Sequence, residues 1–326
     1  TLRPEEFARV EGFGFVSGCS THADRLATIR DTWQRFGTLV SFGQSSGPSK
    51  EFTINDLTRG SLRVTRPTLF HHTAREGWLA QASSAMFDLI ADAASPVAII
   101  GGAGWNAKAR EYFQTFATRI GLPVATAFRR QDAIAPDCPV YAGNLGYGPN
   151  PKLVERVKNA DLIIAVGARL GEATTDGYEV PSLEHPGQLL VHIHPDPEEL
   201  GRVYRTDLAL CCAVDEFAEC AALWEDEGII AFDAGAEAHR EWLDWSTPRP
   251  SDAAIDLAAC VGAMREALPA DTIICNGAGN FAGWWHRYWR YAAYPGQLAP
   301  TCGAMAAAFS PFRMRTTSLP VWRPMS

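Results

Sequence analysis

The sequence predicts an α/β protein with a parallel, Rossmann-like sheet, and three observations carry this prediction. Five short apolar runs lie between residues 96 and 214: PVAIIGGAGW, LPVATAFRR, DLIIAVGAR, QLLVHIHPD and LALCCAV. Their apolar residues are continuous rather than alternating, which is typical of strands buried on both faces. Helix-like segments separate most of the runs, as parallel strands require. We therefore expect a parallel sheet with helices on both faces.

Size, charge and cysteine usage limit the class of protein. The 326 residues allow two or three domains, and 47% apolar residues are sufficient for ordinary cores. The net charge of −8 argues against a general nucleic-acid-binding protein, whose surface would be basic. No apolar run approaches the roughly 18 residues that a membrane span requires. The eight cysteines include no C-x-x-C pair, and no secretory signal opens the chain, so we expect reduced thiols in the cytoplasm.

A glycine-rich turn follows the first apolar run. Gly101, Gly102 and Gly104 lie between this predicted strand and the next helix, where backbone N–H groups can approach a phosphate. The turn lacks the G-x-G-x-x-G spacing, so a tight strand-to-helix turn without a ligand is an equal alternative. We therefore name these glycines as candidate nucleotide-binding residues and leave both interpretations open.

Two further loops leave the carboxyl ends of predicted strands. Residues 170–178 follow the third run, and residues 191–204 complete the fourth run and continue beyond it. Open α/β sheets bind their ligands at this edge. His192 and His194 alternate with apolar residues and therefore face the same side of the strand. A metal would need further ligands, and none is in view, so we favour hydrogen-bonded histidines and assign no metal ligand.

Residues 37–93 contain GTLVSFGQSSG and TRPTLFHHTAREGWLAQASSAMFDLIA. These phrases resemble the C-terminal part of NADPH-dependent quinone oxidoreductases of the medium-chain dehydrogenase superfamily. The resemblance implies that Phe42, Gly43, Gln44 and Ser45 lie against the nicotinamide end of NADPH. The glycine-rich dinucleotide turn and the catalytic N-terminal domain of that family do not precede this segment. We therefore do not expect NADPH binding or quinone reductase activity.

From about residue 95 to 305, four phrases occur in a specific order: PVAIIGGAGW, LPVATAFRRQD, YAGNLGYGPNPKLVERVKNADLIIAVGARLGE and HIHPDPEELGRVY. Together they resemble the central domain of thiamine diphosphate-dependent enzymes of the acetolactate synthase type. The resemblance implies a six-stranded, parallel, Rossmann-like (DHS-like) domain that is usually non-catalytic and binds the ADP part of FAD in some members. Members commonly carry acidic residues where this chain has His192, Ile193 and His194, which argues against FAD here.

The next two phrases, TIICNGAGNFAGWWH and QLAPTCGAM, resemble the opening of the cofactor-diphosphate domain of the same enzymes. The resemblance implies that Ala278, Gly279 and Asn280 touch the diphosphate of thiamine diphosphate. It also implies that the Gly303 carbonyl accepts a hydrogen bond from the aminopyrimidine amino group and that Met305 holds the cofactor in its bent form. Six aromatic residues follow the turn, and we expect a packed helix face rather than a binding platform: Trp284, Trp285, Tyr288, Trp289, Tyr291 and Tyr294.

The resemblance stops after Met305. The family continues with a Gly-Asp-Gly strand end and an asparagine that hold Mg²⁺, a cation requiring oxygen ligands. Here AAAFSPFRMRTTSLPVWRPMS follows instead, and we expect an unstructured tail. The family's N-terminal domain, with its activating glutamate, does not precede the central domain. We therefore assign no catalytic residue, and we expect impaired binding of thiamine diphosphate and Mg²⁺ and a chain that is inactive alone.

The sequence thus predicts a central α/β domain flanked by incomplete α/β pieces. Residues 1–36 have no assignment, 37–94 form the quinone oxidoreductase-like fragment, 95–230 the central domain, 250–305 the incomplete cofactor domain and 306–326 the tail. A gene fusion, a frameshifted pseudogene or an assembly artefact would each produce this composite. The first hypothesis is an acetolactate synthase-like polypeptide from a homo-oligomeric family that decarboxylates or ligates 2-keto acids. The alternatives are a nucleotide-binding or assembly module without catalysis and a residual NADPH:quinone oxidoreductase.

Overall fold

The computed structural model describes residues 38–40, 58, 63–65 and 78–300, except residues 103, 182–186, 225–230, 250 and 278. The chain divides into two compact units, Thr1–Leu79 and Ala80–Ser326. In the first unit, β1 (Thr38–Val40) pairs in parallel with β2 (Arg63–Thr65). In the part that the structure describes, no helix has the length and apolar character needed to cross a membrane.

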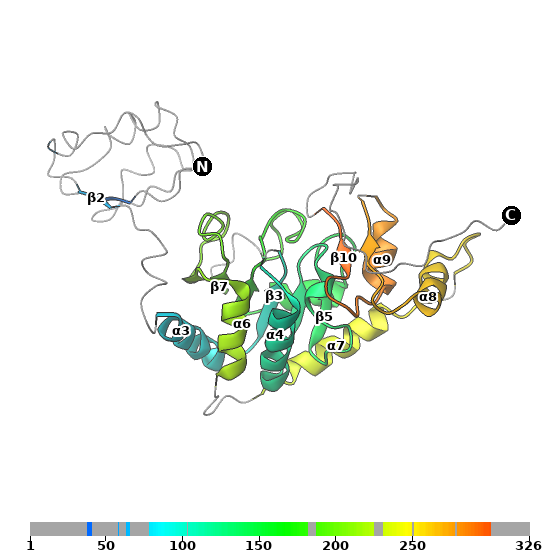
Figure 1. The fold of residues 1–326 in the computed structure, drawn as a ribbon, viewed down its shortest axis with the longest axis horizontal. Coiled ribbons are helices and arrows are strands. Elements are labelled where there is room, and N and C mark those ends of the chain that lie inside the picture. Colours follow the sequence, from blue (N-terminus) through cyan, green and yellow to red (C-terminus); the bar gives the residue numbers. More distant parts are fainter. Residues whose placement is uncertain are drawn as a thin grey trace, which may run out of the picture. The chain divides into compact units, whose positions relative to one another are not determined.

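The second unit contains a six-stranded parallel sheet (Figure 1). The strands lie in the order β5-β4-β3-β6-β7-β8, and each neighbouring pair is parallel. The chain proceeds outward from β3 to β5 and then crosses back to β6, so the topological switch point lies between β3 and β6. The predicted parallel α/β sheet is confirmed. Its strands are β3 (Pro96–Ile100), β4 (Val124–Thr126), β5 (Tyr141–Asn144), β6 (Leu162–Val166), β7 (Leu189–Ile193) and β8 (Leu208–Leu210).

Strand β5 is the one strand of this sheet that the apolar pattern did not reveal. Its sequence, YAGN, is short and contains Gly143 with a positive φ of 111°. A Cβ on Gly143 would lie 2.9 Å from Cδ1 of Trp242 on α7 (Ala234–Trp245). The rings of Tyr141 and Trp242 are 4.6 Å apart. Close packing by α7 therefore accounts for a glycine in this edge strand.

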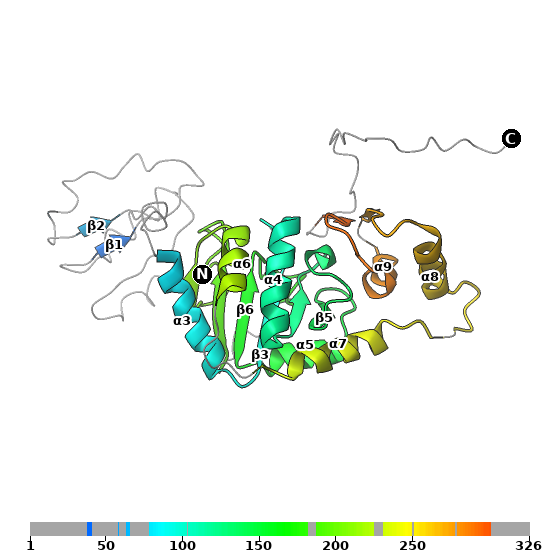
Figure 2. The same ribbon diagram turned by 60° about the horizontal axis from the view of Figure 1, so that its bottom comes forward.

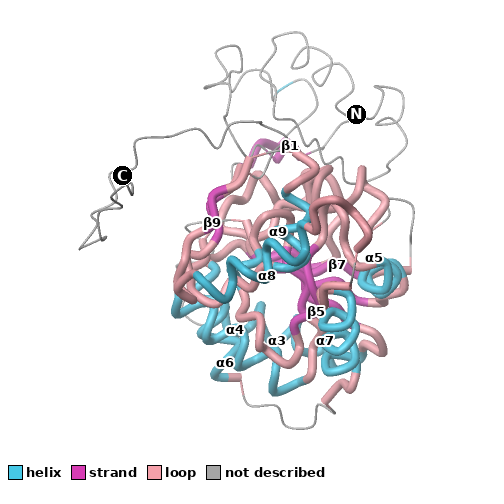
Figure 3. The backbone as a smooth tube through the Cα atoms, turned by 90° about the vertical axis from the view of Figure 1, so that its right-hand side faces the viewer, coloured by secondary structure: helices cyan, strands magenta, loops and turns pink. Residues whose placement is uncertain are grey.

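Helices cover both faces of the sheet (Figure 3). Helices α3 (Trp78–Asp92), α4 (Ala107–Ile120) and α6 (Val214–Leu223) lie on one side, and α5 (Pro151–Lys158) and α7 lie on the other. Successive side chains of a strand point to opposite faces, so both faces of each central strand are buried. The core on the α5 side includes Val97, Ile99, Ile163, Leu153 and Val157.

Helix α3 packs within the sheet-containing unit, whereas the sequence places a boundary after residue 94. The side chain of Phe87 is 5% exposed. Its ring stacks on Trp224, with centroids 3.9 Å apart and planes 7° apart, and lies 6.0 Å from the ring of Phe116. The compact unit accordingly begins at Ala80. Burial of the apolar face of α3 decides where this unit starts.

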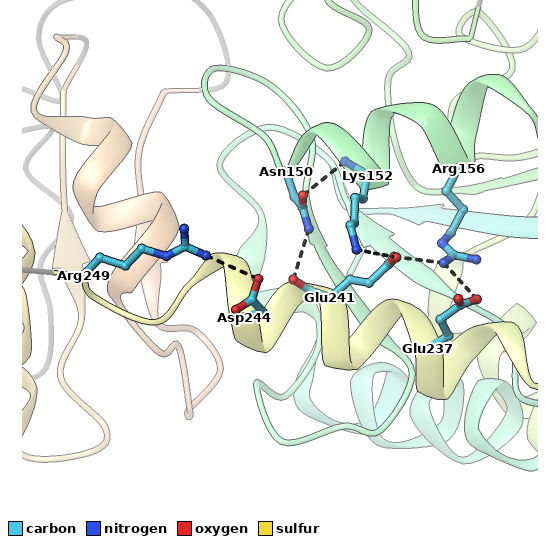
Figure 4. Close-up of polar contacts among 7 residues, drawn as sticks. All are labelled: Asn150, Lys152, Arg156, Glu237, Glu241, Asp244 and Arg249. Atoms are coloured by element: carbon cyan, nitrogen blue, oxygen red, sulfur yellow. Dashed lines mark hydrogen bonds and ion pairs between the residues drawn. The ribbon is translucent and has the colours of Figure 1, made fainter.

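Ion pairs hold α7 against α5 (Figure 4). Glu241 of α7 pairs with Arg156 at 2.9 Å and with Lys152 at 3.3 Å, and Arg156 also approaches Glu237 at 3.4 Å. Asn150 caps α5 by accepting a hydrogen bond from the Lys152 N–H, and its side-chain amide donates to the Glu241 carbonyl at 3.3 Å. These contacts place the end of α7 beside the sheet, where the chain continues into residues 251–300.

Residues 251–300 form a smaller α/β piece (Figure 2). It contains α8 (Leu257–Ala267), β9 (Ile274–Cys275), α9 (Ala282–Tyr288) and β10 (Gln297–Leu298), and β9 and β10 pair in parallel. The expected packed helix face is only partly present: Trp284 is 38% exposed, Tyr288 is buried, and the other two buried aromatic residues follow the end of α9. The apolar cluster consists of Ala258, Val261, Ile274, Tyr288, Trp289 and Tyr291.

Candidate functional site

The loops that follow β6 and β7 enclose a cavity of about 230 Å³. These are the two loops that the sequence identified as the ligand-binding edge, at the carboxyl ends of parallel strands. Because β6 and β7 are neighbours in the sheet, their loops meet at the same place. The lining includes Arg169, Tyr178, His192, Glu199, Arg202 and Tyr204.

A buried carboxylate organises the charges of this cavity. The Glu199 side chain is 8% exposed and contacts Arg169 Nε at 3.2 Å and Arg202 Nη1 at 2.8 Å. The two arginine side chains are 64% and 62% exposed, so part of each guanidinium remains open to solvent. Two guanidinium cations around one carboxylate leave a net positive charge, which favours an anionic ligand. Planar guanidinium groups are well matched donors for such a ligand. The sequence pointed to these loops but did not single out the three charged residues.

The two histidines at the end of β7 each form a hydrogen bond with the backbone. His192 Nε2 lies 2.9 Å from the Ala168 carbonyl, which can only accept, so this nitrogen carries the proton. His194 Nδ1 accepts from the Asp196 N–H at 3.0 Å. Burial lowers the pKa of both imidazoles, so both are neutral at neutral pH. Across residues 78–300, as far as they are described, no group of three or more His, Cys, Asp or Glu side chains could hold a metal ion.

The glycine turn after β3 is closely packed. A Cβ on Gly102, whose φ is +72°, would lie 2.0 Å from the Gly167 carbonyl oxygen. A Cβ on Gly104 would lie 3.1 Å from Val214 Cγ2. Gly101 also has a positive φ, of 146°. Contact between the β3 and β6 loops therefore requires glycine whether or not a phosphate approaches, and nucleotide binding at this turn stays a prediction.

The expected thiamine diphosphate residues fall only partly within the described chain. Gly279 and Asn280 are described, whereas Ala278, Gly303 and Met305 are not. The four residues assigned to NADPH also lie outside the described residues: Phe42, Gly43, Gln44 and Ser45.

The described part of the cofactor turn fits a diphosphate group. Gly279 has a φ of +156°, and a Cβ there would lie 2.7 Å from the Phe281 ring, so the turn requires glycine. The neighbouring Asn276 is 3% exposed, and its Oδ1 has no hydrogen-bond partner among the described residues. The Asn276 Nδ2 donates to the Gly277 carbonyl at 3.4 Å, so the spare capacity of Asn276 is that of an acceptor. Asn280 offers a second side-chain amide.

A buried polar junction joins the loop after β4 to the β9–β10 pair. Asp132 is 0% exposed, and its Oδ2 accepts hydrogen bonds from the N–H groups of Gly296 and Gln297 at 3.1 and 3.2 Å. Burial raises the pKa of Asp132, although these two donors favour the charged form. The Gln131 N–H donates to Gln297 Oε1 at 2.9 Å, and Gln131 Nε2 donates to the His286 carbonyl at 2.6 Å. Sequence patterns did not reveal this junction, because its partners are more than a hundred residues apart.

His286 is buried at this junction without a side-chain hydrogen bond. It is 3% exposed, and neither ring nitrogen has a partner among the residues that the structure describes. Its ring meets the Phe128 ring edge-on at 5.8 Å. Burial, together with the charge of Arg129, lowers the pKa of His286 to about 4. The imidazole is therefore neutral in the folded protein.

Acid should destabilise the protein through His286. Its pKa is 6.5 when unperturbed and about 4 when folded, so between these values the unfolded state binds more protons and stability falls as pH falls. At pH 5 the loss should be about 2 kcal/mol. Urea unfolding of the protein and of the His286→Phe variant at pH 7.5 and pH 5 measures it. The variant should lose less stability on acidification. If both proteins lose the same free energy of unfolding between pH 7.5 and pH 5, the lowered pKa of His286 is contradicted.

Comparison with known proteins bears on the central sheet. Residues 83–220 match the family model described as "Thiamine pyrophosphate enzyme, central domain". A sulfoacetaldehyde acetyltransferase of Alcaligenes xylosoxydans xylosoxydans is 29% identical over 48% of this chain and 26% of its own length. The acetolactate synthase large subunit of Corynebacterium glutamicum is 26% identical over 60% of this chain and 32% of its own. The acetolactate synthase isozyme 2 large subunit of Escherichia coli is 24% identical over 86% of this chain and 50% of its own length.

The matches thus span about a quarter to a half of the length of these three relatives. The comparisons do not support the resemblance of residues 37–93 to quinone oxidoreductases, which stays a prediction. The six-stranded parallel sheet is consistent with the matched central domain. Sheet, family model and relatives agree that the central part of this chain, residues 83–220, is similar to the central domain of thiamine pyrophosphate enzymes.

Proposed function

We propose that this chain is part of a thiamine diphosphate-dependent enzyme that decarboxylates or ligates a 2-keto acid. The observation that carries the proposal is the buried junction between the loop after β4 and β10, the strand that pairs with β9 just before the predicted cofactor turn. Gln131 and Asp132 bind Gln297, and the turn at Gly279 and Asn280 lies in the same compact unit as the sheet. Relatives named as acetolactate synthases support this reaction class.

Each part of the proposed site has a distinct role. Thiamine diphosphate, when bound, supplies the carbon centre and electron sink for the reaction. Gly279 would allow the backbone to approach the diphosphate, and the side-chain amide of Asn280 would donate a hydrogen bond to it. By family resemblance, the Gly303 carbonyl would accept a hydrogen bond from the ring amino group, and Met305 would support the cofactor. The Mg²⁺ that accompanies the diphosphate needs oxygen ligands, and we assign none of them.

A thermal-shift titration with thiamine diphosphate and Mg²⁺ tests the proposal. A ligand that binds only the folded state stabilises it by about 2.7 kcal/mol at a hundred times its Kd, so the melting temperature should rise and the effect should need the diphosphate. Thiamine without diphosphate is the ligand control. The Gly279→Ala variant should lose the shift, because a residue with a Cβ is strained at a φ of +156° and the turn would change its conformation.

Gly283→Ala is the matched control, since no described heavy atom lies within 4 Å of its added Cβ. This variant should keep the shift. No shift for the unchanged protein would contradict the proposed function. Pyruvate consumption in the same samples tests the separate expectation that the chain is inactive alone, and turnover above the blank would contradict that expectation.

The cavity after β6 and β7 favours a second candidate function, the binding of an ADP-like nucleotide without catalysis. Arg169 and Arg202 could receive the phosphates, and Glu199 could accept from a ribose hydroxyl. ADP and FAD belong in the same titration for this reason. A shift with ADP and none with thiamine diphosphate would favour the nucleotide-binding module over the enzyme.

A further inference from the structure

Arg129 joins the carboxyl ends of the two strands that lead into the expected cofactor segments. It lies in the loop after β4, and its side chain is 3% exposed. Its Nη2 donates to the carbonyl of Gly277, just after β9, at 3.0 Å, and its Nη1 donates to the carbonyl of Pro300, just after β10, at 2.5 Å. One guanidinium therefore bridges the ends of two neighbouring parallel strands.

The backbone and the side chain of Arg129 are both held in a defined geometry. Its φ is +58°, a left-handed conformation that is unfavourable for a residue with a Cβ and persists only where the surroundings impose it. The guanidinium carbon lies 4.6 Å from the centre of the Phe128 ring, which orients the cation. The loop thus accepts a strained residue in order to present this guanidinium to the two carbonyls.

Asp132, close to Arg129 in the chain, holds β10 from its other end. Asp132 accepts from the N–H groups of Gly296 and Gln297 at the start of β10, whereas Arg129 donates to Pro300 just past its end. The loop after β4 therefore holds β10 at both ends and reaches the end of β9 through the Gly277 carbonyl.

We propose that Arg129 is a positioning residue for thiamine diphosphate. It sets the spacing between Gly277, which precedes the turn at Gly279 and Asn280, and Pro300, just after β10. This inference rests on the proposed function, since the cofactor contacts of both segments belong to it. Only a forked donor can serve two carbonyls at once, and a lysine ammonium lacks that planar fork.

Isothermal titration of the whole chain with thiamine diphosphate and Mg²⁺ tests this role. Arg129→Met should raise the Kd at least tenfold, and Arg129→Lys should give an intermediate increase because one carbonyl remains served. Arg119→Met is the matched control: Arg119 also donates to backbone carbonyls, those of Ala221 and Trp224 near the end of α6. The control should leave the Kd unchanged.

Hydrogen exchange of the cofactor-free variants gives a second readout that does not depend on the ligand. In Arg129→Met, peptides from residues 272–300 should exchange faster, while peptides from residues 96–166 should keep their protection. Arg119→Met should not affect residues 272–300. In Arg129→Lys, the Kd and the exchange rates should lie between those of the unchanged protein and those of Arg129→Met, because the lysine keeps one donor.

Three results would overturn the proposal. If the unchanged protein binds thiamine diphosphate and both Arg129 variants bind it equally tightly, the positioning role is overturned and the proposed function stays intact. No binding by the unchanged protein would overturn the proposed function and this role with it. Loss of protection over residues 96–166 in both Arg129 variants would make Arg129 a folding residue instead.

Discussion

Replacing Gly102 with alanine should lower the free energy of unfolding by more than about 4 kcal/mol, a loss that few single substitutions reach. The added Cβ would lie 2.0 Å from the Gly167 carbonyl oxygen. Neither backbone segment can yield easily, because they continue from the paired strands β3 and β6. The φ of +72° at Gly102 adds strain for a residue with a Cβ. Urea unfolding followed by circular dichroism measures the effect.

Gly148→Ala separates the collision from the backbone strain. Gly148 has a nearly identical φ of +71°, but among the described residues no heavy atom lies within 4 Å of its added Cβ. This control should cost about 1–2 kcal/mol. Similar losses in the two variants would show that the β3 and β6 loops are not in close contact. In that case a phosphate-binding role would become the better reason for glycine at position 102.

Replacing Phe87 with alanine should destabilise the sheet-containing unit by about 3–5 kcal/mol, the usual cost of truncating a buried phenylalanine. Phe87 stacks on Trp224 and contacts Phe116 of α4, so its removal leaves a cavity beside these two aromatic side chains. Chemical unfolding at constant temperature measures the loss. Because Phe87 precedes residue 94, the result also tests whether α3 belongs energetically to the sheet.

Phe281→Ala provides the exposed counterpart, since Phe281 is 49% exposed. Its loss should be below about 1 kcal/mol. If Phe87→Ala were equally mild, residues up to 94 would behave as a separate piece, as the sequence boundary implies. A large loss confined to Phe87→Ala would instead support the unit that begins at Ala80.

Elements whose signal is local could be predicted from the sequence. Five of the six strands appeared as continuous apolar runs. For the central strands β3 and β6 the reason is that a strand buried on both faces needs apolar side chains at every position. Helix α5 was visible in the same way: Pro151 fits the first helical position, and Leu153 and Val157 are both buried. The loops after β6 and β7 could be named as a ligand edge, because the carboxyl ends of parallel strands bind ligands.

Contacts between distant segments could not be predicted in this way. Asp132 reaches the N–H of Gly296 across 164 residues, and no periodicity in either segment indicates this pairing. The sequence also did not predict that Glu199 pairs with two arginines. Nor did it predict that Trp242 of α7 packs so closely on position 143 that only glycine fits there.

The sequence by itself determined the fold class and five strands of its sheet, because burial imposes a residue pattern along each element. Only the tertiary structure decided that β5 completes the sheet, that α3 belongs to it and that Arg129 joins β9 to β10. Those features depend on which loops the strand order brings together. That order follows from how the whole chain packs, and no single stretch of residues encodes it.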